Sequence, residues 1–259
     1  MRNSLPARML DHVPDAMVNY VANAYLRRKF SAAPIFIGGA PRSGTSLLLS
    51  LLGSHPHIHA IEYETTSFHP RQKLERLFAA IFFEDHARHR RHIDRDKTRF
   101  AEKTPGNVRH VAEINAFFNA QVVFINIVRD GRDVVTSYHP SRPGEYFVPI
   151  ERWVEDIRFG LDAQQLNNVY MLKYEDLVAS PVHAIQGICE FLGEPYLPKM
   201  LEYQKYTNVK DISAWQGGAK PIHTGSLCKW RNPKHAERIR EFYKNADAVA
   251  LTRQLGYPE

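Results

Sequence analysis

A short apolar run, a glycine-rich turn and an apolar helix follow one another near the start of the chain, and this order constrains the fold most. Residues 34–39 (PIFIGG) show the pattern of a strand buried on both faces of a parallel sheet. Residues 40–44 form the turn, and residues 45–52 are good helix formers, followed by Gly53 and Pro56. Such a unit predicts an α/β fold with ligands at the carboxyl ends of the strands.

The alternation continues along the chain. Strand patterns occur at 58–61, 121–128 and 169–173, and helix patterns at 11–29, 74–92, 133–138, 150–166, 181–192 and 235–255. Residues 198–233 are expected to be irregular, because Gly and Pro interrupt the pattern there. We therefore predict one domain, 1–259, with an open, mostly parallel sheet, helices on both faces, and residues 1–30 as a helical segment packed on it.

Composition places the chain among ordinary globular proteins, with 44% apolar and 24% charged residues in 259. Lys plus Arg exceed Asp plus Glu by 34 − 28 = 6, a moderately basic balance that suits anionic ligands. Two cysteines, Cys189 and Cys228, are too few for a disulfide framework, so a reducing cytoplasm is expected. The amino-terminal stretch is interrupted by Asp15, Asn19 and Asn23, and no membrane span is predicted.

The turn at residues 39–46 (GAPRSGTS) matches the phosphate-binding pattern GxxxxGK[ST] except that Thr45 stands in place of the lysine. Arg42 supplies a positive charge from inside the turn instead. One arginine beside a helix amino terminus suits a donor with a single 5′-phosphate joined to an anionic leaving unit. The residues expected to bind it are Pro41, Arg42, Ser43, Gly44, Thr45 and Ser46.

A second anion site is expected directly after the long β-branched run, in the motif VRDGRDVVTS. Arg129 ends the strand, and Ser137 lies about two turns into the predicted helix, so both side chains can converge on one phosphate. Arg132 is expected to pair with Asp133 or Glu155.

Three further charged residues are candidates for chemistry at the same strand ends. A carboxylate in the segment EYET, Glu62 or Glu64, can take a proton from an attacking nucleophile, although an isolated glutamate pair is usually a solvated loop. Lys103 in AEKTP would stabilise developing negative charge if it points into the cleft; the alternative is an ordinary exposed lysine.

The motif PRSGT, followed by His55 and Pro56, resembles the 5′-phosphosulfate loop of sulfotransferases that use 3′-phosphoadenosine 5′-phosphosulfate (PAPS). It is most similar to the branch that contains the tyrosylprotein and heparan sulfate 3-O-sulfotransferases. The resemblance implies that PAPS is the donor, that PAP is the product, and that Arg42 contacts the phosphosulfate.

The resemblance also implies a role for each remaining candidate. Glu64 would be the general base, with Glu62 as the alternative, and Lys103 would stabilise charge on the sulfuryl group or the bridging oxygen. Arg129 and Ser137 would hold the 3′-phosphate.

Two more segments recur in related enzymes. A basic loop with a tryptophan covers the nucleotide there, so Lys229 and Arg231 are candidates for phosphate contact and Trp230 for stacking; the alternative is a surface loop in which Trp230 anchors the tail helix. Residues 174–177 (YEDL) are interpreted as a structural helix-capping turn.

Two other classes of function stay open on the sequence. One is an ATP- and Mg²⁺-dependent phosphotransferase with a degenerate phosphate loop, and the other is a non-catalytic basic module that binds nucleic acid or sulfated glycans. The basic helix face with His86, His89 and His92 lacks metal-ligand spacing and is expected to be solvated. We expect sulfuryl transfer without a metal and without nucleic acid, to a small-molecule, glycan or peptide acceptor that the sequence does not identify.

Overall fold

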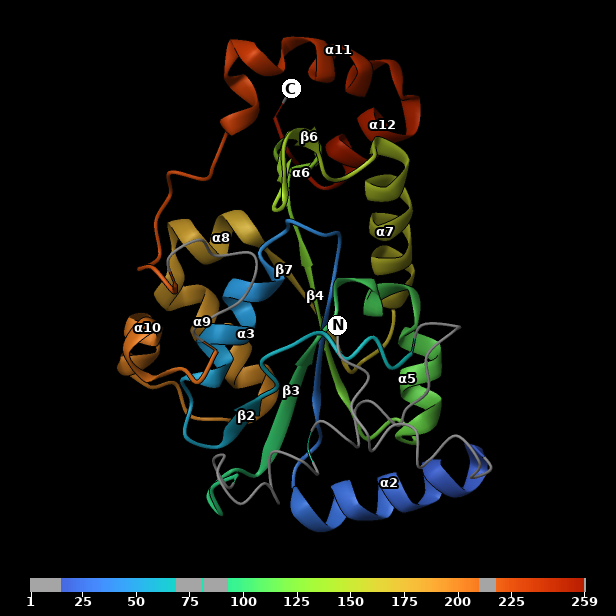
Figure 1. Ribbon diagram of the computed structural model, residues 1–259, viewed down its shortest axis with the longest axis vertical. Coiled ribbons are helices and arrows are strands. Elements are labelled where there is room, and N and C mark those ends of the chain that lie inside the picture. The colour runs from blue at the N-terminus through green and yellow to red at the C-terminus, as the bar shows by residue number, and fades with distance from the viewer. Residues whose placement is uncertain (1–14, 69–80, 82–92, 210–217, 259) are drawn as a thin grey trace.

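A central parallel sheet organises the protein. The structure, a computed structural model, describes residues 15–68, 81, 93–209 and 218–258. All neighbouring strands of this sheet pair in parallel, in the order β2-β3-β1-β4-β7 (Figure 1). The strands are β1 (Ile35–Gly38), β2 (Ile58–Ala60), β3 (Arg99–Lys103), β4 (Val123–Val128) and β7 (Val169–Lys173). The predicted α/β class and parallel sheet are confirmed.

Apolar residues on both faces of the strands explain why helices cover the sheet on two sides. Ile35 and Ile37 of β1 pack into one core cluster and Phe36 into another, and all three are 0% exposed. Full burial of such a side chain is worth about 1.5–3 kcal/mol. The helices of the first cluster are α3 (Thr45–Gly53), α8 (Tyr174–Ala179), α9 (Pro181–Leu192) and α10 (Tyr203–Tyr206).

Two further clusters complete the core. The second contains residues of α2 (Asp15–Lys29) and α5 (Val111–Phe117), and the third those of α7 (Ile150–Ala163), α11 (Ala236–Lys244) and α12 (Ala246–Gln254). In Figure 1, α2 lies across the lower end of the sheet, whereas α11 and α12 lie beyond the carboxyl end of β4. The tail therefore packs at the end of the sheet where functional residues were expected.

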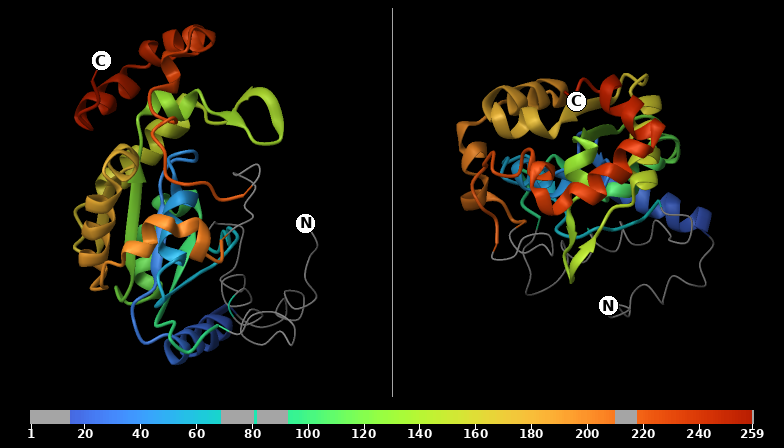
Figure 2. Two further views of the ribbon diagram at one scale, coloured as in Figure 1. Left: turned by 90° about the vertical axis from the view of Figure 1, so that its left-hand side faces the viewer. Right: turned by 90° about the horizontal axis from the view of Figure 1, so that it is seen from above.

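The remaining elements are short. They are α6 (Gly131–Val135), η1 (Pro105–Arg109), η2 (Pro198–Glu202), η3 (Lys229–Arg231) and η4 (Pro233–His235), with a hairpin of β5 (Tyr138–His139) and β6 (Arg142–Tyr146). This hairpin projects from the body of the protein in the left view of Figure 2. Within the described part of the chain, no helix has the length and apolar character needed to cross a membrane.

Four sequence expectations differ from the structure. The hairpin was not predicted, and α6 ends at Val135, so Ser137 lies beyond the helix instead of two turns into it. Tyr174 begins a helix, α8, instead of a turn. The predicted tail helix is broken at Asn245, whose side chain accepts a hydrogen bond from the Ala248 amide at 3.0 Å and so starts α12.

Two expected segments cannot be compared with the structure. The basic helix at 74–92, with its three histidines, and residues 1–14 of the amino-terminal segment lie outside the described residues.

Candidate functional site

The glycine-rich turn after β1 presents the amino terminus of α3. Gly44 is the N-cap residue in a left-handed conformation (φ 97°), and it brings no side chain that would satisfy the amides of the first turn. A Cβ atom at Gly44 would lie 2.3 Å from the Tyr174 ring, so another residue would not fit. The buried Ser43 hydroxyl has no hydrogen-bond partner among the residues that the structure describes. These free donors make the turn suitable for an anion.

The two predicted anion sites adjoin each other. Arg129 follows β4, the neighbour of β1 in the sheet, and its Nη1 donates to the Arg42 backbone oxygen at 3.0 Å. Arg42 has a left-handed backbone (φ 71°), which costs a non-glycine residue roughly 1–2 kcal/mol. Burial, and next the charge of Arg129, lower the pKa of Arg42. Because like charges repel, this arrangement favours an anion between them.

Besides the Arg42 backbone oxygen, Arg129 contacts Ser226 and Tyr174. Its Nη2 donates to the Ser226 backbone oxygen at 2.5 Å, and its guanidinium lies 4.3 Å from the centre of the Tyr174 ring. Tyr174 in turn shares a 2.6 Å hydrogen bond with the Ser226 hydroxyl. The arginine is 7% exposed, and its Nε has no hydrogen-bond partner in the described part of the chain. Sequence analysis assigned residues 174–177 a structural role and did not place Tyr174 in the site.

Asp133 connects the basic loop to this arginine. Its carboxylate accepts hydrogen bonds from the Cys228 amide at 2.9 Å and the Trp230 amide at 3.0 Å, and lies 3.5 Å from Arg129 Nη2. Ser137 Oγ donates to the Asp133 backbone oxygen at 2.8 Å. The expected partners Arg129 and Ser137 are thus linked through Asp133, which sequence reasoning did not select.

The basic loop 229–231 packs against α6, where the Trp230 amide donates to Asp133, and its basic side chains have different neighbours. Burial, and next the charge of Arg129, lower the pKa of Lys229, so this lysine belongs to the same positive region as the two arginines. Trp230 packs its ring 4.2 Å from the Arg132 guanidinium and 5.3 Å from that of Arg231.

The expected partners of Arg132 were wrong. Its guanidinium pairs with Asp130 at 2.7 Å, and its nitrogens also donate to the Tyr243 hydroxyl and the Pro258 backbone oxygen. Asp130 is the N-cap of α6, which places its carboxylate beside Arg132. Arg132 is 1% exposed, so it joins α6 to the tail instead of facing the cleft.

The predicted base and the predicted lysine meet as an ion pair. Glu64 follows β2 and Lys103 ends β3, and Lys103 Nζ lies 2.5 Å from Glu64 Oε1. The Glu64 side chain is 45% exposed and that of Lys103 is 7% exposed, so the carboxylate faces solvent and the ammonium lies beneath it. The alternative base, Glu62, is exposed, and its Oε1 lies 3.5 Å from Asn208 Nδ2.

A neighbouring carboxylate, Glu102, was not predicted. It is 0% exposed and accepts hydrogen bonds from Thr65, Thr104 and Asn107. Burial raises the pKa of Glu102, and the three donors oppose that shift. Its position next to Lys103 in the motif EKTP is the one sequence feature that could have indicated a role for Glu102.

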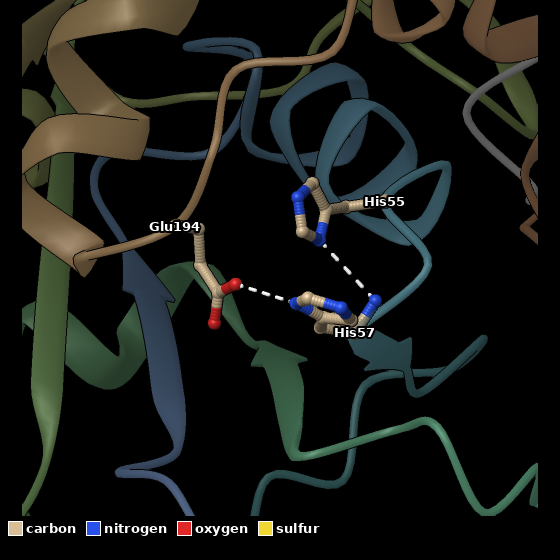
Figure 3. Close-up of side chains that lie close together, drawn as sticks. All are labelled: His55, His57 and Glu194. Atoms are coloured by element: carbon tan, nitrogen blue, oxygen red, sulfur yellow. Dashed lines mark hydrogen bonds and ion pairs between the residues drawn. The ribbon is translucent and has the colours of Figure 1, made fainter.

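Away from these residues, one group of possible metal ligands is present in the described part of the chain: His55, His57 and Glu194 (Figure 3). His57 Nδ1 bonds the Glu194 carboxylate at 2.8 Å, and Arg99 pairs with the same carboxylate at 3.1 Å. Both ring nitrogens of His55 are engaged, with the His57 amide and the Pro195 oxygen. These contacts therefore connect the end of α9 with the start of β2 and with β3. We assign no metal to this group of residues.

These features define a class of protein. The α/β fold carries a glycine turn leading into a helix, two arginines from adjoining strand ends and a carboxylate–lysine pair. This arrangement is typical of proteins that bind a phosphate-bearing nucleotide. The chain belongs to the sulfotransferase family, since the sulfotransferase domain model matches residues 33–251.

Curated relatives agree with this assignment. Protein-tyrosine sulfotransferase A of Caenorhabditis elegans is 25% identical over 86% of this chain and 67% of its own length. Sulfotransferase 2A6 of Rattus norvegicus is 28% identical over 55% of this chain and 60% of its own. An uncharacterized protein of Aquifex aeolicus is 28% identical over 78% of this chain but only 31% of its own. The chain thus spans about one to two thirds of these relatives.

Solved structures share the fold. The sulfotransferase domain of the Synechococcus PCC 7002 olefin synthase superposes with a TM-score of 0.60 at 20% identity, covering 88% of this chain and 97% of that one. Mouse sulfotransferase SULT7A1 complexed with PAP gives 0.55 at 16% identity, covering 88% and 92%. At these identities the likeness establishes the fold alone.

Proposed function

We propose that this chain transfers a sulfuryl group from PAPS to a hydroxyl or amine of an acceptor by direct in-line displacement. The observation that carries the proposal is the contact between Arg129 and the Arg42 turn, which joins two anion sites into one. A nucleotide with phosphates at both its 5′ and 3′ positions matches two adjoining sites better than a linear triphosphate does.

In this proposal the turn residues hold the phosphosulfate end of the donor. Arg42, the first amides of α3 and the buried Ser43 hydroxyl donate to it. The remaining turn residues, Pro41, Gly44, Thr45 and Ser46, shape the turn. Arg129 and Ser137 hold the 3′-phosphate, and Lys229 adds positive charge from the covering loop. Trp230 and Arg231 belong to the same loop and help it to cover the nucleotide.

Glu64 and Lys103 carry the chemistry. Glu64 takes the proton from the acceptor as the new bond to sulfur forms, and the bond from sulfur to the bridging oxygen breaks to release PAP. Lys103 stabilises the negative charge that grows on the bridging oxygen. Glu64 is favoured over Glu62 because it pairs with the lysine at 2.5 Å. No step requires a metal.

The setting of the reaction is also a proposal. We infer a single domain over 1–259 and a cytoplasmic location, which both free cysteines suit. The acceptor is a small molecule, a glycan, a lipid or a peptide tyrosine, and no nucleic acid takes part.

The test incubates the protein with ³⁵S-labelled PAPS and a panel of phenols, sugars, lipids and tyrosine peptides, with mass spectrometry for the added sulfuryl group. Thermal shift with PAP, ATP–Mg²⁺ and an oligonucleotide accompanies it. We expect metal-independent stabilisation by PAP and label on one acceptor class. Stabilisation by ATP–Mg²⁺ alone would favour a phosphotransferase, and by the oligonucleotide alone a nucleic-acid-binding module.

A further inference from the structure

A fully buried carboxylate lies directly behind the Glu64–Lys103 pair. Glu102 is 0% exposed, and its Oε1 accepts from the Thr65 amide at 3.1 Å, the Thr65 hydroxyl at 2.9 Å and the Thr104 hydroxyl at 2.6 Å. Its Oε2 accepts from Asn107 Nδ2, also at 2.6 Å. Four donors on one carboxylate satisfy a charge that would otherwise be costly to bury.

These donors come from three separate pieces of the site. Thr65 follows Glu64 directly, and Thr104 follows Lys103 directly. Asn107 lies in η1 and also donates to the Ile37 backbone oxygen of β1, the strand that leads into the phosphate turn. A single carboxylate therefore holds together the two segments that carry the proposed base and lysine, and ties them to β1.

Two further hydrogen bonds reinforce this junction. The Thr66 amide donates to the Thr104 hydroxyl at 3.2 Å, and the Ser67 hydroxyl donates to the Thr65 hydroxyl at 2.9 Å. Apart from the half-buried Thr66, the residues of this network are buried, whereas the Glu64 side chain is 45% exposed. An exposed glutamate has many rotamers and little packing to restrain its backbone, so the buried network is what fixes its segment.

We propose that Glu102 is a positioning residue for sulfuryl transfer, which sets the Glu64–Lys103 contact through Thr65 and Thr104. The inference rests on the proposed function, because it assigns Glu64 and Lys103 to the transfer step. Glu102 bonds the neighbours of these two residues, so it acts through them and not on the donor or acceptor.

The test compares Glu102→Gln with a matched control, Glu194→Gln. Glutamine keeps the shape but sets an amide donor against either Asn107 or the two threonine hydroxyls. Glu194 has a side chain that is only 7% exposed, and it pairs with Arg99 at the opposite end of β3, outside the site. Figure 3 shows its contact with His57. Crystal structures of both variants and the wild type would be compared, with kcat and KM for PAPS on the acceptor found in the panel.

In Glu102→Gln we expect Lys103 and Glu64 to separate beyond ion-pair distance, kcat to fall about 10- to 100-fold, and KM for PAPS to change less than about threefold. Glu194→Gln should lower the melting temperature and keep both the ion pair and kcat. An unchanged ion pair with unchanged kcat in Glu102→Gln would overturn the proposal, as would an equal loss of kcat in the control.

A second pair of variants guards against a Glu102→Gln protein that does not fold. Thr65→Val removes one donor to Glu102 and should lower kcat in the same direction, whereas Thr65→Ser keeps the hydroxyl and should restore it. Equal kcat in these two variants would also overturn the proposal. If wild type transfers no label, the proposed function fails, and the crystallographic separation still decides the role of Glu102.

Discussion

The two halves of the proposed site, one for the nucleotide and one for the acceptor, differ in how their charges are balanced. The nucleotide half contains Arg42, Arg129 and Lys229, and the charge of Arg129 helps to lower the pKa of both neighbours. The acceptor half contains the closed Glu64–Lys103 pair, backed by the satisfied carboxylate of Glu102. In the proposed function, an anion from outside therefore balances the charge of the nucleotide half, whereas the charges of the acceptor half are paired within the protein.

This difference predicts where binding and catalysis can be separated. Removing a cation from the nucleotide half should weaken PAP binding, because the phosphate loses a charged donor. Changing the acceptor half should slow transfer and leave PAP binding intact, because its charges are already paired within the protein. The predictions below test this division, from the largest expected effect to the smallest.

Glu64→Gln should give the largest effect. Loss of the general base should lower kcat by about 10²- to 10⁴-fold while the Kd for PAP stays within about twofold. Steady-state transfer from labelled PAPS and calorimetry with PAP measure the two quantities. Glu62→Gln is the matched control and should keep kcat; the reverse pattern would move the base to Glu62.

Arg129→Ala should weaken PAP binding by about 10- to 100-fold, the range expected for charged hydrogen bonds. The variant also leaves the Arg42 and Ser226 oxygens without this donor, so circular dichroism should accompany the titration. Arg152→Ala removes an arginine that pairs with Asp156 on α7 and should bind PAP normally. Equal weakening in both would contradict a specific phosphate contact.

Asp133→Asn should have a smaller effect on the same half. Asparagine keeps one acceptor, so either the Cys228 or the Trp230 amide loses its partner and the covering loop is held less firmly. We expect PAP to dissociate about three- to tenfold faster in stopped-flow displacement. Asp247→Asn, at an exposed ion pair with Arg158, is the control and should leave the rate unchanged.

The smallest effect concerns stability outside the site. Burial chiefly lowers the pKa of His55, so the unfolded chain takes up its proton first as the pH falls. Neutral His55 therefore contributes to the free energy of unfolding above about pH 6.5, and this contribution is lost as the pH falls towards the folded-state pKa. Between pH 7.5 and 5.5 the melting temperature of wild type should fall about 2 °C more than that of His55→Asn. Parallel curves would exclude this linkage.

The sequence predicted the sheet well because buried parallel strands and amphipathic helices leave strong local patterns. The bounds of β7 and α9 agree with the predicted ranges 169–173 and 181–192. The β5–β6 hairpin had no such pattern, since β6 is largely exposed and contains Pro143 and Gly144. Tyr138 belongs to β5 of this hairpin, so the helix that was predicted to run to residue 138 ends at Val135, before Ser137.

Candidate site residues could be predicted from the sequence where they belong to a recognisable motif. They could not be predicted where their role depends on burial in the folded protein. Arg42 and Arg129 were each selected from a motif, and the Arg129 guanidinium donates to the Arg42 backbone oxygen. Glu102 and Asp133 were not selected, because the number of donors around a carboxylate depends on segments distant in sequence. Tyr174 likewise gains its contact with Arg129 from the pairing of β4 with β7.

The central claim is that the Arg42 turn and Arg129 bind opposite ends of one adenosine bisphosphate. Metal-free calorimetry with PAP and with AMP, which lacks the 3′-phosphate, measures it directly in wild type and Arg129→Ala. We predict that wild type binds PAP about 10- to 100-fold more tightly than AMP and that the variant loses this preference. Equal affinity of the wild type for PAP and AMP, or no heat with PAP, would contradict the account.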